Sequence, residues 1–205
     1  MFGEKISIAV SVLILSLIFS YLDIAKLPLF LAIFAVIILV NVIAKKITAH
    51  YLEVNSSVHI WDFRQYWFAE SWKFARPAPI GLLLPPILIV FTYGAIKWLG
   101  MLQTEFEAKL TKLIRKRKPW SYPGLRNLDV SLILLAGFLA NIILALLAVK
   151  LSPQLAALTL LYCFYNLIPI GKLDGFQLLV NNRALYVLTV MLLAVAAGVF
   201  LVLQI

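Results

Sequence analysis

The residues best suited to chemistry lie between Asn166 and Gly175, in the segment NLIPIGKLDG. This segment follows an apolar run, contains the helix-breaking Pro169 and Gly171, and brings in the carboxylate of Asp174. A carboxylate at the edge of an apolar membrane segment is costly, so by default it marks a functional site. Backbone groups freed by proline and glycine at this depth must find partners within the protein. We therefore expect an irregular, packed and polar site here.

A second polar group lies in the preceding apolar run, where the segment AGFLAN ends at Asn141. Amides at membrane depth hydrogen-bond between helices or satisfy broken backbone, and this applies to Asn141 and to Asn166. Gly137 and Ala140 would let another backbone come close. Taken singly, each asparagine is better explained by helix packing than by a functional site.

Together the two segments resemble the site-2 protease family, zinc metalloproteases that cut helices inside the membrane. The family's second motif is matched in register by Asn166, Pro169, Leu173, Asp174 and Gly175. The preceding family motif is usually Gly-Pro-x-x-Asn, and here Phe138 replaces the proline before Asn141. The resemblance covers roughly residues 27–180 and implies the family's fold, with Asp174 as a metal ligand.

The catalytic half of the family pattern is missing. The family carries His-Glu-x-x-His at the end of its second span, where the histidines hold zinc and the glutamate activates water. The best register here runs from Lys46 to His50, with Ile47 in place of the glutamate. A lysine ammonium repels zinc and isoleucine cannot move a proton. The resemblance therefore implies a catalytically degenerate member with no bound cofactor.

An alternative metal site uses His50 and Glu53, which would share a helix face if the helix continues. With Asp174 they would make a three-ligand zinc site. The competing interpretation places both residues at the membrane interface. Cys163, the single cysteine, excludes a cysteine zinc cluster and is expected to be a small core residue.

The retained carboxylate predicts a different partner. A buried carboxylate without a metal needs a partner or a proton. Lys46 occupies the register of the lost ligand, so we predict an ion pair between Lys46 and Asp174. Lys46→Ala would then destabilise the fold, because one buried charge would be left unpaired. The alternative is that Lys46 extends to the membrane interface.

The amino-acid composition indicates an integral membrane protein. The 205 residues are 63% hydrophobic and 13% charged, and the mean hydropathy is +1.00. A soluble domain of this size does not need so many apolar residues. We expect one integral membrane domain over residues 1–205, in the cell membrane and in contact with the bilayer. The net charge of +9 is explained by a positive-inside bias and anionic lipid, with no nucleic-acid partner.

The predicted architecture is all-α and polytopic. Apolar runs predict five transmembrane helices, near 6–22, 27–44, 130–149, 155–170 and 184–203. The proline-rich segment 80–96 is predicted to be re-entrant, with a sixth crossing as the alternative. The re-entrant arrangement leaves only Lys26 and Lys150 on one side and the other 16 of the 18 basic residues on the opposite side. The positive-inside rule then makes the second side, with the N-terminus, cytoplasmic.

The stretches between the spans carry the remaining signals. Residues 45–78 are polar and aromatic, as is typical of a membrane–water boundary. Alternation near 58–63 and 104–110 predicts two strands that could pair at the cytoplasmic face. The basic loop 104–127 contains a run of positive charges suited to lipid headgroups, namely Arg115, Lys116, Arg117 and Lys118.

Three functions follow from these observations. The first is a degenerate site-2-protease-like protein that binds segments of other membrane proteins, including their transmembrane helices. The second is an active intramembrane metalloprotease with unusual zinc ligands. The third is a small-solute transporter, which the broken helix near Asp174 would suit.

Overall fold

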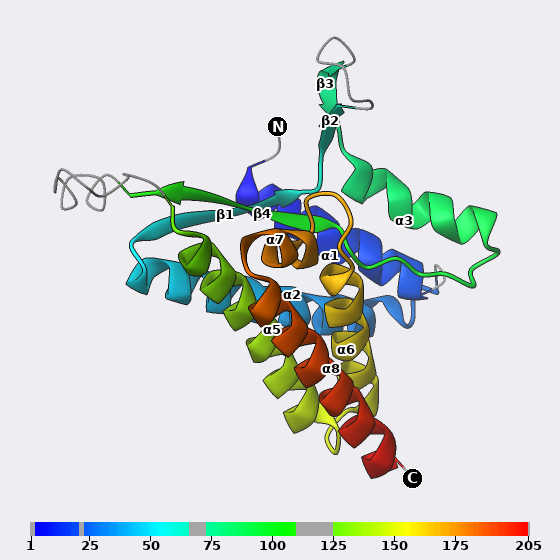
Figure 1. Cartoon of the computed structure of the whole chain (residues 1–205). Coiled ribbons are helices and arrows are strands. Elements are labelled where there is room, and N and C mark those ends of the chain that lie inside the picture. The colour runs from blue at the N-terminus through cyan, green and yellow to red at the C-terminus, as the bar shows by residue number, and fades with distance from the viewer. Residues whose placement is uncertain (1–2, 21–22, 66–72, 110–124, 205) are drawn as a thin grey trace, which may run out of the picture.

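The computed structural model describes residues 3–20, 23–65, 73–109 and 125–204 (Figure 1). It is mostly helical, with a small β element, as the sequence predicts. The elements in chain order are α1 (Glu4–Ser20), α2 (Leu27–Tyr51), β1 (Val54–Ile60), β2 (Phe63–Gln65), β3 (Lys73–Ala78), α3 (Ile80–Phe91), β4 (Leu102–Ala108), α5 (Asn127–Ala148), α6 (Pro153–Leu167), α7 (Asp174–Asn181) and α8 (Arg183–Gln204).

Three of the described helices, α2, α5 and α8, are long and apolar enough to cross a membrane. They correspond to the predicted spans 27–44, 130–149 and 184–203. The predicted spans 6–22 and 155–170 became α1 and α6, which have 17 and 15 residues. At 1.5 Å per residue these two helices are about 26 and 22 Å long, below the ~30 Å of a hydrocarbon core. The structure therefore does not give a clear count of five spans.

The predicted re-entrant segment 80–96 contains a helix of 12 residues, α3. Pro85 and Pro86 lie inside this helix. Two residues with positive φ follow the helix, Tyr93 at 52° and Gly94 at 82°. The helix therefore stops before the apolar segment ends. α3 is about 18 Å long and is too short to cross a bilayer as a straight helix.

The two strands expected from alternation form and pair. β1 and β4 are antiparallel, with Val54 opposite Ala108 and Ile60 opposite Leu102. The predicted limits, 58–63 and 104–110, were displaced by two to four residues toward the C-terminus. A second two-stranded sheet, β2 with β3, was not expected from the sequence.

The helices pack around two main clusters of apolar side chains. One cluster joins α1 and α2 to the strands and centres on Phe34, Ile37 and Leu99. The other joins α5, α6 and α8 and includes Phe138 and Leu178. α2 belongs to the first cluster and α5 to the second, and the two helices pack against each other (Figure 1). The two clusters therefore meet along the contact between α2 and α5.

Polar side chains gather at one end of these helices. Glu4, at the start of α1, pairs with Lys46, near the end of α2, at 2.8 Å. The turn between α1 and α2 lies at the other end of both helices. There Lys26 pairs with Asp23, and its hydrogen bond lowers the pKa of that carboxyl. The sheet and the loop before α7 belong to the Glu4 end, which is where the candidate site lies.

Candidate functional site

The centre of the candidate site is a buried ion pair between Lys45 and Asp174. Lys45 Nζ lies 2.5 Å from Asp174 Oδ2, and both side chains are 4% exposed. Thr104 joins the pair, because Lys45 Nζ donates to its hydroxyl at 3.1 Å and that hydroxyl donates to Asp174 Oδ1 at 2.9 Å. Helix α2, strand β4 and helix α7 each supply one member of this closed set. Each carboxylate oxygen therefore has a donor.

The face of α2 that carries Lys45 packs closely against α5. Asn41 and Lys45 are four residues apart, so they share one face of the helix. A Cβ placed on Gly137 of α5 would lie 2.7 Å from Lys45 Cε and 3.1 Å from Asn41 Nδ2. Glycine is thus required at 137 because the lysine stem passes directly over it. The sequence predicted that Gly137 lets another backbone come close, whereas the groups that lie against it are the side chains of Lys45 and Asn41.

The segment after α6 brings Asp174 to this place. Gly171 adopts a left-handed φ of +60°, and a Cβ there would lie 2.3 Å from the ring of Trp61. Gly175 lies against the backbone of Leu167, where a Cβ would be 2.1 Å from the carbonyl oxygen. Leu173 is fully buried between Trp61 and Trp98. The sequence prediction of an irregular, packed segment is confirmed.

A second polar network fastens the same segment to the sheet. Lys172 pairs with Asp62 at 2.9 Å, and Gln103 donates to the same carboxylate oxygen at 3.1 Å. Gln177 of α7 donates to the backbone carbonyls of Thr104 and Lys172, both at 2.9 Å. The position of Asp174 is therefore set from the strand side as well as from the helix side.

The predicted pairing of Lys46 with Asp174 was wrong by one residue. Lys46 is rotated by about 100° from Lys45 around α2. It pairs with Glu4, and its side chain is 47% exposed. Lys45, which the sequence analysis did not select, is the residue that reaches the carboxylate. The burial pattern of α2 gives the reason, because Lys45 continues the buried stripe through Asn41 and Val42 whereas Lys46 leaves it.

His50 and Glu53 do not join Asp174. His50 is exposed near the end of α2, and Glu53 follows the helix with a φ of 56°. Within the described part of the chain, no three histidine, cysteine or acidic side chains form a group able to hold a metal. The groups that do surround Asp174 are an ammonium and a hydroxyl. This donor set does not fit zinc, which takes thiolates, neutral imidazoles and carboxylates.

Asn141 and Asn166 are buried, and some of their side-chain amide atoms have no hydrogen-bond partner among the described residues. Asn166 donates through Nδ2 to the Tyr162 carbonyl at 2.9 Å, but its Oδ1 has no partner among the described residues. Neither amide atom of Asn141 has a partner there. Unpaired buried amides are uncommon in folded proteins. Cys163 is buried in the α5–α6–α8 cluster, as expected for a core residue.

A polar cavity of about 570 Å³ lies beside β4. Its walls come from β4 between Gln103 and Glu107, from α7 at Phe176 and Gln177, and from the loop at Gly171 and Lys172. The cavity therefore borders the strand residue, Thr104, that holds Asp174. The predicted lipid site at Arg115, Lys116, Arg117 and Lys118 lies outside the described residues.

The edge of β4 that faces away from β1 points its backbone groups toward the polar cavity. The Trp61 N–H donates to the Met101 carbonyl at 2.8 Å, and the Lys109 N–H donates to the Glu53 carbonyl at 3.3 Å. In an antiparallel ladder, backbone groups alternate in direction, so even-numbered residues of β4 point their N–H and C=O away from β1. The bond from Gln177 to the Thr104 carbonyl agrees with this direction. Among the described strands, β4 pairs with β1 alone.

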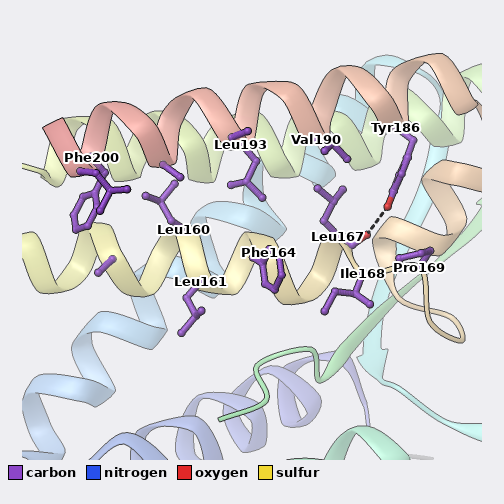
Figure 2. Close-up of a pocket in the computed structure, with 14 residues that line it drawn as sticks. Leu160, Leu161, Phe164, Leu167, Ile168, Pro169, Tyr186, Val190, Leu193 and Phe200 are labelled. Atoms are coloured by element: carbon purple, nitrogen blue, oxygen red, sulfur yellow. Dashed lines mark hydrogen bonds between the residues drawn. The ribbon is translucent and has the colours of Figure 1, made fainter. Parts of the chain in front are cut away.

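An apolar groove of about 620 Å³ runs between α6 and α8 (Figure 2). Leu160, Phe164 and Leu193 line its length, and Ile168 and Pro169 line its end. Tyr186 donates its hydroxyl to the Leu167 carbonyl at 3.4 Å, so the one phenol in the groove is turned toward the backbone of α6. The loop after α6 therefore borders both the apolar groove and the polar cavity.

Of the residues in this ion-paired set, sequence reasoning identified Asp174 but missed Lys45 and Thr104. The signal for Lys45 was present in the sequence, because a polar residue four positions earlier, Asn41, lies inside the same apolar run. Thr104 reaches the site only through the pairing of β4 with β1, which no local pattern specifies. No model of a known protein family matches this chain, and neither a curated protein nor a solved structure matches it.

Proposed function

We propose that this chain is a multi-pass membrane protein similar to site-2 proteases, in which an ion pair replaces the zinc centre. In this proposal the protein binds a segment of another membrane protein and does not cleave it. The observation that carries the proposal is the buried contact of Lys45 with Asp174. It puts a fixed positive charge beside the one carboxylate that the family uses as a metal ligand.

The residues of α2 support the loss of hydrolysis. The family's two zinc-binding histidines are four residues apart on its second span. In the sequence these positions were aligned with Lys46 and His50, but the pair with this spacing that is buried on the face toward Gly137 is Asn41 and Lys45. Val42 follows Asn41, so the position of the water-activating glutamate carries an aliphatic side chain. An amide, an ammonium and a valine provide neither zinc ligands nor a general base.

We also infer five crossings and a cytoplasmic N-terminus. α1 and α6 are short, but each is antiparallel to a longer helix that it packs against, α2 and α5 respectively. The Glu4–Lys46 and Asp62–Lys172 pairs put the start of α1, the end of α2 and the loop before α7 at one end. If α1 and α6 cross with their partners, most basic residues collect on that side, as the positive-inside rule expects of the cytoplasm, while Lys97 lies over Phe19 near the other end of α1.

Two surfaces suit a membrane-protein segment. An extended segment can add to the outward edge of β4, because backbone hydrogen bonds at a strand edge bind peptides of many sequences. The apolar groove between α6 and α8 suits the hydrophobic part of the same segment. Both surfaces border the loop from Ile168 to Lys172, so one segment passing that loop would contact both.

Site-specific photo-crosslinking in cells tests this function. A photoreactive residue at Glu105, which is exposed and lines the cavity, should crosslink to full-length membrane proteins. The same residue at Lys150, at the opposite end of α5, is the control. Ala108→Pro removes one outward N–H of β4 without removing a bond to β1, so it should reduce the crosslinks at Glu105 severalfold. Ala108→Ser keeps the N–H and should leave them unchanged.

Two outcomes would contradict the proposal. Crosslinks at Glu105 that are equal in Ala108→Pro and Ala108→Ser would exclude strand addition at β4. Crosslinked partners recovered as fragments that disappear in Asp174→Ala would show hydrolysis, and would favour the metalloprotease alternative.

A further inference from the structure

A second polar pocket lies outside the Lys45–Asp174 site, at the end of α2. It has a volume of about 290 Å³ and is built from the last turns of α2, the start of β1 and the residue after β4. Its floor is apolar, because Ala49 and Val54 are 2% and 1% exposed. Its polar groups therefore line the sides and the mouth.

The charges in this pocket are mostly positive. Lys46 and His50 are four residues apart on α2 and share a face, and Lys109 faces them from the end of β4. Lys46 is already paired with Glu4. The described residues provide no carboxylate partner for Lys109 or His50. The pocket thus keeps two cationic or donor groups available and shares a third.

Neutral donors complete the lining. Asn55 is exposed and Ser56 half-buried, and both border the pocket from β1. The carboxylates of Glu53, which precedes Val54, and of Glu107, the cross-strand neighbour of Asn55, are not among the lining groups. Ammonium, imidazole, amide and hydroxyl groups around one small cavity are donors for the oxygens of a phosphate group, which carries about −1.5 to −2 charges near neutral pH.

We propose that this pocket binds a phosphate monoester, either as a lipid headgroup or as a free phosphorylated compound. Its place supports this chemistry, because it opens at the polar end of α2, one of the candidate membrane-spanning helices. A volume near 290 Å³ accommodates a phosphate and a few further atoms and is below the usual range for drug-sized ligands. Phosphate would contact Lys109 and His50 directly and share Lys46 with Glu4.

Two probes separate the sources of the phosphate. Native mass spectrometry of the full chain relipidated with phosphatidylcholine and roughly 10% phosphatidic acid measures retention of the phosphomonoester lipid. Phosphorus NMR of the chain in pure phosphatidylcholine nanodiscs, with inorganic phosphate added, measures binding of the free anion. Near a surface each basic residue contributes roughly fivefold to binding of an anionic lipid, so His50→Gln with Lys109→Gln should reduce binding by about tenfold or more.

Lys150→Gln is the matched control, because it removes an exposed charge from the far end of α5. Retention of phosphatidic acid that depends on His50 and Lys109 supports a headgroup site. Binding of inorganic phosphate alone, with the same dependence, supports a site for free phosphorylated compounds. Binding of neither probe, or equal losses in the double variant and in Lys150→Gln, would overturn the proposal. Equal melting temperatures of the two variants and wild type would confirm that folding is intact.

Discussion

At the residue scale, two neighbouring lysines have opposite roles. Lys45 is buried against Asp174 and Thr104, whereas Lys46 is half-exposed and pairs with Glu4. Breaking a buried ion pair leaves an uncompensated charge in a low-dielectric interior, which costs several kcal/mol. An exposed pair contributes little, because water screens it. The two positions therefore provide a test with a built-in control.

Lys45→Ala should lower the free energy of unfolding by about 3–5 kcal/mol, because Asp174 would remain buried without its cation. Lys46→Ala should change it by less than about 1 kcal/mol. Replacing both partners of the buried pair, with Lys45→Met and Asp174→Leu together, should recover most of the loss. Denaturant or thermal unfolding of the purified protein in detergent measures all three. Equal effects of the two lysine variants would show that the Lys45–Asp174 pair does not stabilise the fold.

At the element scale, the structure separates what local patterns predict from what packing decides. Apolar runs located the helices, and proline and glycine located the break before Asp174. The face of α2 that meets Asp174 was not predicted correctly. Lys45 and Lys46 differ by one position, or about 100° around a helix, and only contacts with α5 and β4 choose between them. His50 lies five positions from Lys45 and is rotated from it by roughly 140°, which explains why it does not reach Asp174.

The strands show the same division. Alternating residues predicted β1 and β4, and the pairing followed from their place on one side of the predicted membrane. Thr104 could not be identified in advance, because its role depends on the register that brings it over α7. α1 has the predicted 17 residues but begins two residues earlier, and α6 is one residue shorter than predicted and also begins two residues earlier, because hydropathy does not reveal where the backbone turns. Pro153 begins α6, and the chain leaves the helix after Leu167, before Pro169.

At the scale of the whole molecule, the five-crossing arrangement makes a prediction about sidedness. In a Cys163→Ala background, single cysteines at Lys26 and Lys150 should react with a membrane-impermeant maleimide on intact cells. Cysteines at Gly3 and Arg183 should react only after the membrane is permeabilised. Gly3 and Lys26 lie on either side of α1, and Lys150 and Arg183 lie on either side of α6. These are the two helices whose crossing is in question. Labelling of Gly3 and Lys26, or of Lys150 and Arg183, from the same side would exclude a crossing by the helix between them.

The central claim is that Lys45 occupies the place of a zinc ligand opposite Asp174, and metal content tests it most directly. The wild-type protein should contain well below one zinc per chain. Asn41→His with Lys45→His would put two imidazoles, four residues apart, on the face that meets Asp174.

This variant should bind about one zinc per chain and lose it when Asp174→Ala is added. The same pair of histidines shifted by one position, Val42→His with Lys46→His, should bind none. Mass spectrometry of the purified proteins gives the answer. Stoichiometric zinc in the wild type, or equal zinc in the matched and shifted variants, would contradict the claim.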